Sequence, residues 1–375
     1  MKILLAPDKF KGSLTARQVC DAMTEGIRLA YPQANIVALP MADGGEGTAE
    51  VLTLATGGEW ITVPALDPLG RPIEASYGIS SDRQTAFIEM SQASGLRLLQ
   101  RHEYNPLQAS TFGTGQLILD AVKQGISKLV LGIGGSATND GGTGMAAALG
   151  WRFLNAQNEP LAPCGGNLVQ INRILPPAQS FYIAVDVACD VTNPLVGPNG
   201  AAAIYGPQKG ASQEDVVILD QGLCHLARLI YDQFGVVLAE VPGAGAAGGM
   251  GAGALFFLKA MLKEGVNVVM EHTRFVDHLP DTDLVLTGEG KIDNQTLQGK
   301  LISGIARQAR QSDVPAIALC GTLEVKPEEI TALDLTAAFS VLTHPQSLDE
   351  ALNTAYDAVR RTTFNLIRLF NSNIK

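Results

Sequence analysis

The feature that most constrains the fold is a repeated order in which a short apolar run is followed by a segment with helical periodicity. KILLAP at residues 2–7 precedes such a segment, whose helix we expect to be capped at Ser13 or Thr15. NIVALPMAD at 35–43 precedes a second segment of this kind, and DLVLTGEG at 283–290 precedes another near the other end of the chain. Strands that alternate with crossover helices form parallel sheets, so both ends of the chain predict an α/β fold.

The middle of the chain departs from this pattern. Between Glu59 and Met90, turn signals at DPLG and SSDR separate residues of alternating polarity, which predicts antiparallel strands. A glycine-rich turn at 242–253 is expected to open a helix that continues through LFFLKAMLKEG at 255–265. The remaining expected elements are strands at 128–135, 181–187, 315–322 and 337–343, helices at 113–125, 215–234 and from about Gly299, and a closing helix with Leu352, Tyr356, Val359 and Thr363 along one side.

These elements predict two α/β domains with mainly parallel sheets and an active-site cleft between them. Because the opening strand–helix pattern returns near the end of the chain, one domain is expected to be discontinuous, with residues 1–58 and 282–375. Residues 59–281 would form the inserted domain, and the segment 90–145 could belong to either.

Composition narrows the classes of partner. The chain has 375 residues and a formal net charge of −10, with 46% hydrophobic and 17% charged residues, which is typical of a folded enzyme and argues against nucleic acid or an anionic membrane as a partner. Its five cysteines lie far apart without a C-x-x-C pair, which argues against structural zinc and a disulfide framework. The first apolar run is too short for a secretory signal, and the uncharged segment 241–258 is too rich in glycine and alanine to span a membrane. We therefore expect a cytoplasmic protein.

Polar residues concentrate in the loops that directly follow the predicted strands. In open parallel sheets, ligands bind outside the carboxyl ends of the strands, so these loops are expected to face one cleft. Their carboxylates would suit Mg²⁺, which binds through one or two carboxylates plus substrate phosphates, and their lysines would neutralise a transferred phosphoryl group. No histidine lies in these loops, so an aspartate is the expected general base. The loops are DKFKGS (8–13), DGGEGT (43–48), GIGGSATNDGG (132–142), DVACDVTNP (186–194) and EGKIDNQ (289–295).

Two glycine-rich segments are candidates for phosphate binding. GIGGSA at 132–137 fits the G-x-G-x-x-A form of a dinucleotide fingerprint, but the acidic residue expected after the next strand is missing, since only Glu159 stands there. Clustered backbone N–H groups at a helix start would favour phosphate in either case. PGAGAAGGMGAG at 242–253 could be a second phosphate loop, or its glycines could serve close helix packing. No Walker sequence is present.

Taken together, several motifs resemble the microbial glycerate kinase family, in its type 1, glycerate 2-kinase-like form. The similarity runs in order from residue 3 to about 345. It implies two α/β domains and the phosphorylation of glycerate with ATP and Mg²⁺, usually to 2-phosphoglycerate. The motifs include APDKFKGSLTA (6–16), PMADGGEGT (40–48), FIEMSQASGL (87–96), GIGGSATNDGGTGM (132–145), ACDVTNPLVGPNGA (188–201) and LTGEGKIDNQTLQGK (286–300).

The chemistry of phosphoryl transfer gives each candidate residue a hypothetical role. Asp190 would accept the hydroxyl proton, with Lys11, Lys209 and Lys291 as the other catalytic residues. ATP would bind to Gly134, Gly135, Ser136, Thr138, Asn139, Gly243, Gly245 and Glu289. Glycerate would bind to Asp8, Ser13, Asp43, Gly44 and Gly45, and Mg²⁺ to Asp186 and Asp293, with Asp43 as a further candidate for the metal.

Alternatives stay open at this point. The enzyme could form 3-phosphoglycerate, because the two hydroxyls differ only by how glycerate is turned in the site. It could be an oxidoreductase that uses the GIGGSA loop for a pyrophosphate, or a non-catalytic protein that binds an organic acid. The sequence is compatible with a monomer or a homodimer.

Overall fold

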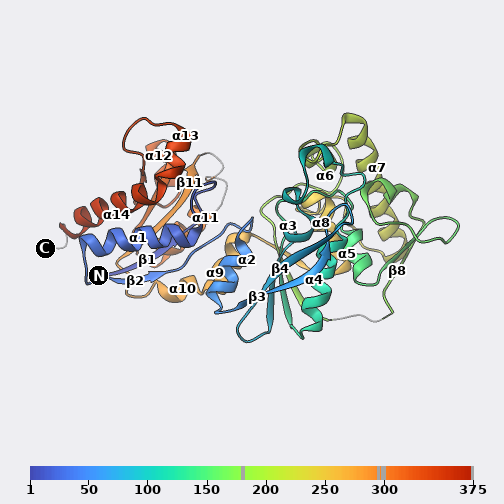
Figure 1. Ribbon diagram of the computed structural model, residues 1–375, viewed down its shortest axis with the longest axis horizontal. Coiled ribbons are helices and arrows are strands. Elements are labelled where there is room, and N and C mark those ends of the chain that lie inside the picture. The colour runs from blue at the N-terminus through green and yellow to red at the C-terminus, as the bar shows by residue number, and fades with distance from the viewer. Residues whose placement is uncertain (179–181, 294–295, 297–300, 373–375) are drawn as a thin grey trace. The chain divides into compact units, whose positions relative to one another are not determined.

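A computed structural model describes residues 1–178, 182–293, 296 and 301–372, and it divides into two compact units (Figure 1). The first unit contains Met1–Asp43 and Val269–Lys375, and the second contains Gly44–Val268. Both predicted boundaries, after residues 58 and 281, lie further along the chain than these. The segment 90–145, left open by the sequence, falls in the second unit. Both units combine helices with a mainly parallel sheet, which confirms the predicted fold class.

The first unit is built on a five-stranded parallel sheet that joins the two ends of the chain. Its strand order is β13-β12-β11-β1-β2, so strands distant in sequence are neighbours in the sheet. Ile3 pairs with Leu284 across the β1–β11 ladder, and Ile3 pairs with Ile36 across β1–β2. The strands are β1 (Lys2–Pro7), β2 (Asn35–Ala38), β11 (Leu284–Ile292), β12 (Ala316–Leu323) and β13 (Ala337–Ser340), all within predicted segments or close to them.

Helices α1 (Ala16–Ala30) and α14 (Ala355–Ser372) lie side by side over this sheet (Figure 1). Thr15 caps α1 through a capping box with Gln18, so of the two predicted caps it is Thr15 that is used. A Cβ atom on Gly26 would lie 2.4 Å from the Arg360 carbonyl oxygen, so the bare glycine lets the two helices approach closely. The predicted closing helix is divided into α13 and α14. The other helices are α10 (Phe275–His278), α11 (Leu301–Gln311), α12 (Pro327–Ala332) and α13 (Leu348–Asn353), and α9 (Gly265–Thr273) spans the boundary at 268/269. The predicted helix start near Gly299 lies outside the described residues.

The second unit contains a six-stranded mixed sheet in the order β10-β9-β6-β5-β4-β3. The pairs β3–β4 and β4–β5 are antiparallel, which confirms the prediction for residues 59–90, and β5, β6, β9 and β10 pair in parallel. Its strands are β3 (Glu59–Leu66), β4 (Pro72–Ile79), β5 (Thr85–Glu89), β6 (Lys128–Gly132), β9 (Ala184–Ala188) and β10 (Met261–Lys263), with β7 (Arg152–Leu154) and β8 (Arg173–Leu175) in a separate ribbon.

The prediction of a continuous helix through 255–265 is wrong. Helix α8 ends at Phe257, and Lys259 adopts a left-handed backbone conformation with φ of 53° that no helix continues. Residues Met261–Lys263 then pair with β9 as a short edge strand, which satisfies the backbone groups on the side that faces β9. The helices of this unit are α2 (Thr48–Ala55), α3 (Ser91–Ser94), α4 (Phe112–Lys123), α5 (Thr143–Ala148), α6 (Ala201–Tyr205), α7 (Gln213–Phe234) and α8 (Ala246–Phe257), with 3₁₀ turns at Leu96–Leu98, Arg101–Glu103, Gly165–Gln170 and Pro207–Lys209.

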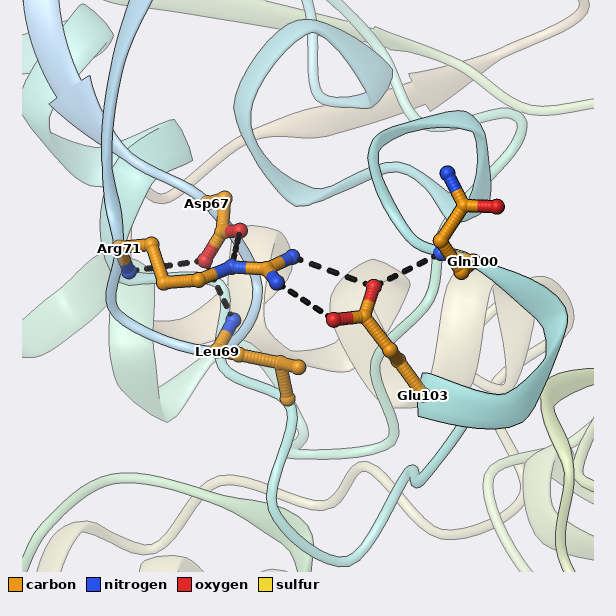
Figure 2. Close-up of polar contacts among 5 residues, drawn as sticks. All are labelled: Asp67, Leu69, Arg71, Gln100 and Glu103. Atoms are coloured by element: carbon orange, nitrogen blue, oxygen red, sulfur yellow. Dashed lines mark hydrogen bonds and ion pairs between the residues drawn. The ribbon is translucent and has the colours of Figure 1, made fainter.

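The predicted DPLG turn between β3 and β4 is held by a charged network (Figure 2). The buried Asp67 accepts hydrogen bonds from the backbone N–H groups of Leu69 and Arg71 at 2.9 Å each. The guanidinium of Arg71 bridges Asp67 and Glu103, and Glu103 in turn accepts the N–H of Gln100 at 2.8 Å. The network therefore fixes the hairpin to the 3₁₀ turn at 101–103. None of the helices in the described parts of the chain combines the length and apolar character needed to cross a membrane.

Candidate functional site

The sheet of the first unit has a topological switch point between β1 and β11. From β1 the chain proceeds to β2 on one side, whereas from β11 it proceeds to β12 and β13 on the other. Asp8 directly follows β1, and Glu289 lies near the carboxyl end of β11. Ligands of open α/β sheets bind outside the carboxyl ends of the strands at such a point, so the topology alone singles out this position.

A cavity of about 660 Å³ lies at this switch point. Three of the predicted loops, distant in sequence, contribute to its lining. The cavity therefore gathers both carboxylates and lysines, which is the combination that metal-assisted phosphate chemistry requires. The predicted site residues that line it are Asp8, Lys11, Ser13, Asp43, Glu289, Lys291 and Asp293.

Asp8 is the most perturbed carboxylate of this cavity. Its side chain is only 7% exposed, although the backbone N–H of Lys9 donates to one oxygen at 2.6 Å. Burial, followed by the negative charge of Asp43, raises the pKa of Asp8 to about 7. A cation next to Asp8 and Asp43 would relieve both effects, so the electrostatics of this position favour one.

The carboxylates near β11 have partners of their own. The Lys291 ammonium lies 2.7 Å from Glu324 and 3.3 Å from Asp293, and Thr296 donates its hydroxyl to Glu289 at 2.6 Å. Within the described residues, no group of three or more histidine, cysteine or acidic side chains is placed to hold a metal ion. Mg²⁺ needs only one or two carboxylates when phosphate oxygens and water complete its shell, and the hard oxygens of Asp8 and Asp43 fit that mode.

The second unit has its own cluster at the carboxyl ends of β5, β6 and β9. Gly44 and Asp190 meet there, because a Cβ atom on Gly44 would lie 2.7 Å from the Gly265 Cα and 3.4 Å from the Asp190 Oδ2. Gly44 also has φ of 92°, which favours glycine. Asp190 is exposed, and its Oδ1 accepts the Gly265 N–H at 2.7 Å. Gly134 adjoins the same cluster, since its Cβ position lies 3.6 Å from the Gly45 Cα.

Glu89 is a member of this region that the sequence analysis did not identify. It is the last residue of β5 and is 5% exposed, and its Oε1 accepts the N–H groups of Gly47 and Ala49 at 2.8 and 3.0 Å. The carboxylate thus fixes the 44–47 loop at the start of α2. The sequence signal that could have identified Glu89 is its position as the one acidic residue at the end of a mainly apolar strand.

The buried Lys209 forms hydrogen bonds to the glycine loop at residues 132–142. It is 1% exposed, and its Nζ donates to the Ser136 hydroxyl at 2.7 Å and to the Thr138 carbonyl at 2.6 Å. Burial lowers the pKa of Lys209 to about 7, and the charge of Asp140 opposes this effect. The side chain therefore positions the loop, whereas the sequence suggested direct contact with the transferred group.

Asp140, a polar residue of the predicted glycine loop to which the sequence analysis assigned no role, organises the rest of the loop. The carboxylate is fully buried and accepts hydrogen bonds from the Thr111 N–H and hydroxyl at 2.8 Å each and from the N–H groups of Gly142 and Gly144 at 3.1 Å each. Thr138 and Asn139 are buried beside it, whereas Gly134 and Gly135 are exposed. Of the predicted nucleotide contacts in this loop, the two glycines are thus the accessible ones.

The loop does not have the form of a dinucleotide-binding turn. In that motif the helix begins within the glycine pattern, so that its N-terminus meets the pyrophosphate. Here β6 ends at Gly132, and α5 begins only at Thr143 and runs to Ala148. The geometry gives no support to the oxidoreductase alternative.

The surroundings of three other predicted residues account for their presence without a bound ligand. Asp186 lies inside β9, not at its end, and Lys263 and Lys128 contact its carboxylate at 2.9 and 3.1 Å. Burial alone would raise the pKa of Asp186, but these two ammonium groups hold it below its usual value. A Cβ atom added to Gly243 would lie 2.9 Å from the Leu262 side chain, and one added to Gly245 would lie 2.1 Å from the Pro194 carbonyl oxygen. Close packing therefore accounts for both glycines.

Comparisons with known proteins agree on one family. The profile described as the Glycerate kinase family matches residues 3–371. The chain is 46% identical to a glycerate kinase of Halalkalibacterium halodurans, with 97% of each chain covered, and 45% identical to a glycerate 2-kinase of Escherichia coli, with 98% of this chain and 97% of the other covered. A solved structure of a candidate glycerate kinase 2 from Salmonella typhimurium LT2 superposes with a TM-score of 0.90 at 41% identity, covering 100% of this chain and 99% of that one.

Proposed function

This chain belongs to the glycerate kinase family and is a phosphotransferase, and we propose that it transfers the γ-phosphoryl group of ATP to the 2-hydroxyl of D-glycerate with the help of Mg²⁺. The observation that carries the proposal is the convergence of Asp8, Asp43, Glu289 and Lys11 on one cavity at the switch point of a parallel sheet. The choice of the 2-hydroxyl is supported by the relative named as a glycerate 2-kinase.

The first unit is proposed to bind the metal and the phosphates. Asp8 and Asp43 would hold Mg²⁺, which neutralises the charge that develops on the phosphoryl oxygens when it is bound. The exposed ammonium of Lys11 lines the same cavity and would pair with a phosphate oxygen. This assignment moves Asp8 from the glycerate role suggested by the sequence to the metal, and of the two roles suggested for Asp43 it selects the metal, because the charge of Asp43 beside buried Asp8 favours a cation. Asp186 is left out, since two lysines already neutralise it.

The second unit is proposed to bind glycerate. Gly44 lies against Asp190, Gly134 adjoins Gly45, and Gly134 and Gly135 are exposed. Backbone N–H groups of such a loop are suitable partners for a carboxylate. Asp190 is exposed while one of its oxygens is fixed by the Gly265 N–H, so it is oriented to accept the proton of the glycerate hydroxyl. Lys209 and Asp140 would act by holding the loop.

The direct test is a coupled assay with ATP, Mg²⁺ and D-glycerate, with the product identified by ³¹P NMR. We expect glycerate-dependent formation of ADP and the resonance of 2-phosphoglycerate. A product phosphorylated at the 3-hydroxyl would overturn the regiochemistry, and an absence of glycerate-dependent ADP would overturn the substrate. Omission of Mg²⁺, followed by its return, tests the metal separately.

We also propose that the enzyme works in the cytoplasm. All five cysteines are free in the structure and lie apart from one another, as expected where thiols are kept reduced.

A further inference from the structure

The cavity of the first unit has one polar end and one apolar end. Its charged residues follow β1 and β11, whereas Val341 and Leu342 follow β13, and Leu348 and Leu352 come from α13. The sheet order β13-β12-β11-β1 separates these ends by three strand spacings. At about 4.8 Å for each spacing, the cavity reaches roughly 14 Å along the carboxyl edge of the sheet.

These dimensions do not match glycerate alone. Glycerate has three carbons, all bearing oxygen, and it offers no apolar surface to a row of leucines. A cavity of 660 Å³ falls in the range that encloses a much larger ligand. ATP combines a triphosphate, which suits the carboxylates and Lys11 in the presence of a metal, with a flat aromatic base at the opposite end of the molecule.

The apolar end exposes surface that a bound ring would cover. Leu348 is 73% exposed and Leu342 is 38% exposed, although both line the cavity. The Ser347 hydroxyl accepts the Glu350 N–H at 3.3 Å and caps α13, which fixes Leu348 in the first turn of that helix. Removing this apolar area from water is favourable in proportion to the area covered.

We propose that the adenine ring of ATP binds to this apolar end of the cavity, with Leu348 as a residue that determines the affinity for the nucleotide. We call this end the leucine wall and define it as Val341, Leu342, Leu348 and Leu352. The inference rests on the proposed function for the identity of the nucleotide. Gln346 lines the same end of the cavity, and its side-chain amide suits the polar edge of a purine.

The kinetic test is Leu348→Ala. Because Leu348 is exposed at a helix start and alanine favours helix, the variant is expected to fold, and we expect the KM for ATP to rise about five- to tenfold, since part of a leucine contact is lost. The KM for glycerate is expected to stay within about twofold. The matched control is Leu29→Ala on α1, a leucine that is 64% exposed and does not line the cavity. An unchanged KM for ATP in Leu348→Ala, or an equal rise in the control, would overturn the proposal.

A second measurement does not depend on turnover of glycerate. The wild-type enzyme is irradiated with 8-azido-ATP and Mg²⁺, with and without excess ATP, and the labelled peptides are mapped by mass spectrometry. We expect ATP-protected labelling within 341–355. Labelling confined to 129–150, or no protected labelling, would overturn the proposal. Labelling at 341–355 in a protein that fails to phosphorylate glycerate would keep the leucine wall and reject the proposed acceptor.

Discussion

The two units place polar groups at the carboxyl ends of parallel strands in different ways. The first unit gathers charged side chains, and burial together with the charge of Asp43 disfavours the ionised form of Asp8. The second unit brings backbone into contact around Gly44 and Gly265, buries Lys209 and Asp140 under the glycine loop and leaves Asp190 exposed. A site of facing carboxylates suits a cation with its phosphates, whereas a site of bare backbone suits a small ligand that must approach closely. Substitutions in the first unit should therefore impair the use of the metal nucleotide, whereas substitutions in the second should impair the binding or reaction of glycerate.

The largest expected effect is that of Asp190→Asn. The amide oxygen still accepts the Gly265 N–H, so the loop should be kept, but the amide cannot take the hydroxyl proton. We expect kcat to fall by about 10²–10⁴-fold, the usual contribution of a general base, with an unchanged melting temperature. Steady-state kinetics and a thermal melt measure both. A variant that retains most of its kcat would remove Asp190 from the mechanism.

Asp8→Asn should separate binding of the metal nucleotide from folding. We expect kcat/KM for ATP to fall about 100-fold, with the KM for glycerate little changed, because one of the proposed metal ligands is lost. The raised pKa means that the folded protein holds a proton on Asp8 that the unfolded chain releases near pH 4, so ionising Asp8 destabilises the fold between about pH 4 and 7. The neutral amide avoids this cost, so the metal-free variant should be at least as stable as wild type at pH 8. Loss of stability together with activity would indicate a structural role instead.

Gly44→Ala tests the close backbone contact of the second unit. The new methyl group would meet the Gly265 Cα at 2.7 Å, in addition to the strain of φ at 92°. We expect about 2–3 kcal/mol of destabilisation and roughly a tenfold rise in the KM for glycerate. Gly70→Ala is the matched control, because φ is 80° there and nothing lies within 4 Å of the added atom. Denaturant melts that show equal losses for both variants would mean that the contact contributes nothing beyond backbone strain.

Lys209→Met gives the smallest and most diagnostic effect. Loss of two buried hydrogen bonds should cost about 2 kcal/mol at pH 7 and weaken glycerate binding only modestly. Because the pKa of Lys209 is lowered to about 7 by burial, the unfolded chain binds more protons between pH 7 and about 10.5. The wild type should gain stability through this window, by at most ~1.4 kcal/mol per pH unit, and the variant should not. Lys123→Met, at an exposed position of α4, serves as the control. Stability curves that stay parallel for wild type and Lys209→Met between pH 7 and about 10.5 would contradict the lowered pKa of Lys209.

Much of the first unit could be predicted because its signals are local. Each strand shows a short apolar run, and the rule that ligands bind at carboxyl ends then places Asp8, Asp43 and Glu289 together. Strand β10 could not be found this way, because three residues show no periodicity and their pairing with β9 is a long-range contact. The proposed metal role of Asp186 has a related origin, because the polar loop is predicted to begin at residue 186, whereas the strand continues to Ala188 and keeps Asp186 in its interior.

Burial depth was the other quantity that the sequence did not reveal. Lys209 follows a short helix in a polar stretch, and nothing local distinguishes it from an exposed lysine. Its position depends on Ser136 and Thr138, far away in the chain. The roles of Glu89 and Asp140 were not predicted for the same reason. Both carboxylates accept hydrogen bonds from N–H groups that are distant in the sequence.

The pairing of β1 with β11 has a consequence for synthesis on the ribosome. Strand β1 emerges first, yet its ladder with Leu284–Gly288 cannot form until most of the polypeptide has been translated. The whole of Gly44–Val268 leaves the exit tunnel in the meantime and is free to fold by itself. Until then only the neighbouring α1 and β2 can cover Ile3, Leu4 and Leu5, so nascent chains stalled before residue 284 should leave part of this apolar strand open to chaperones.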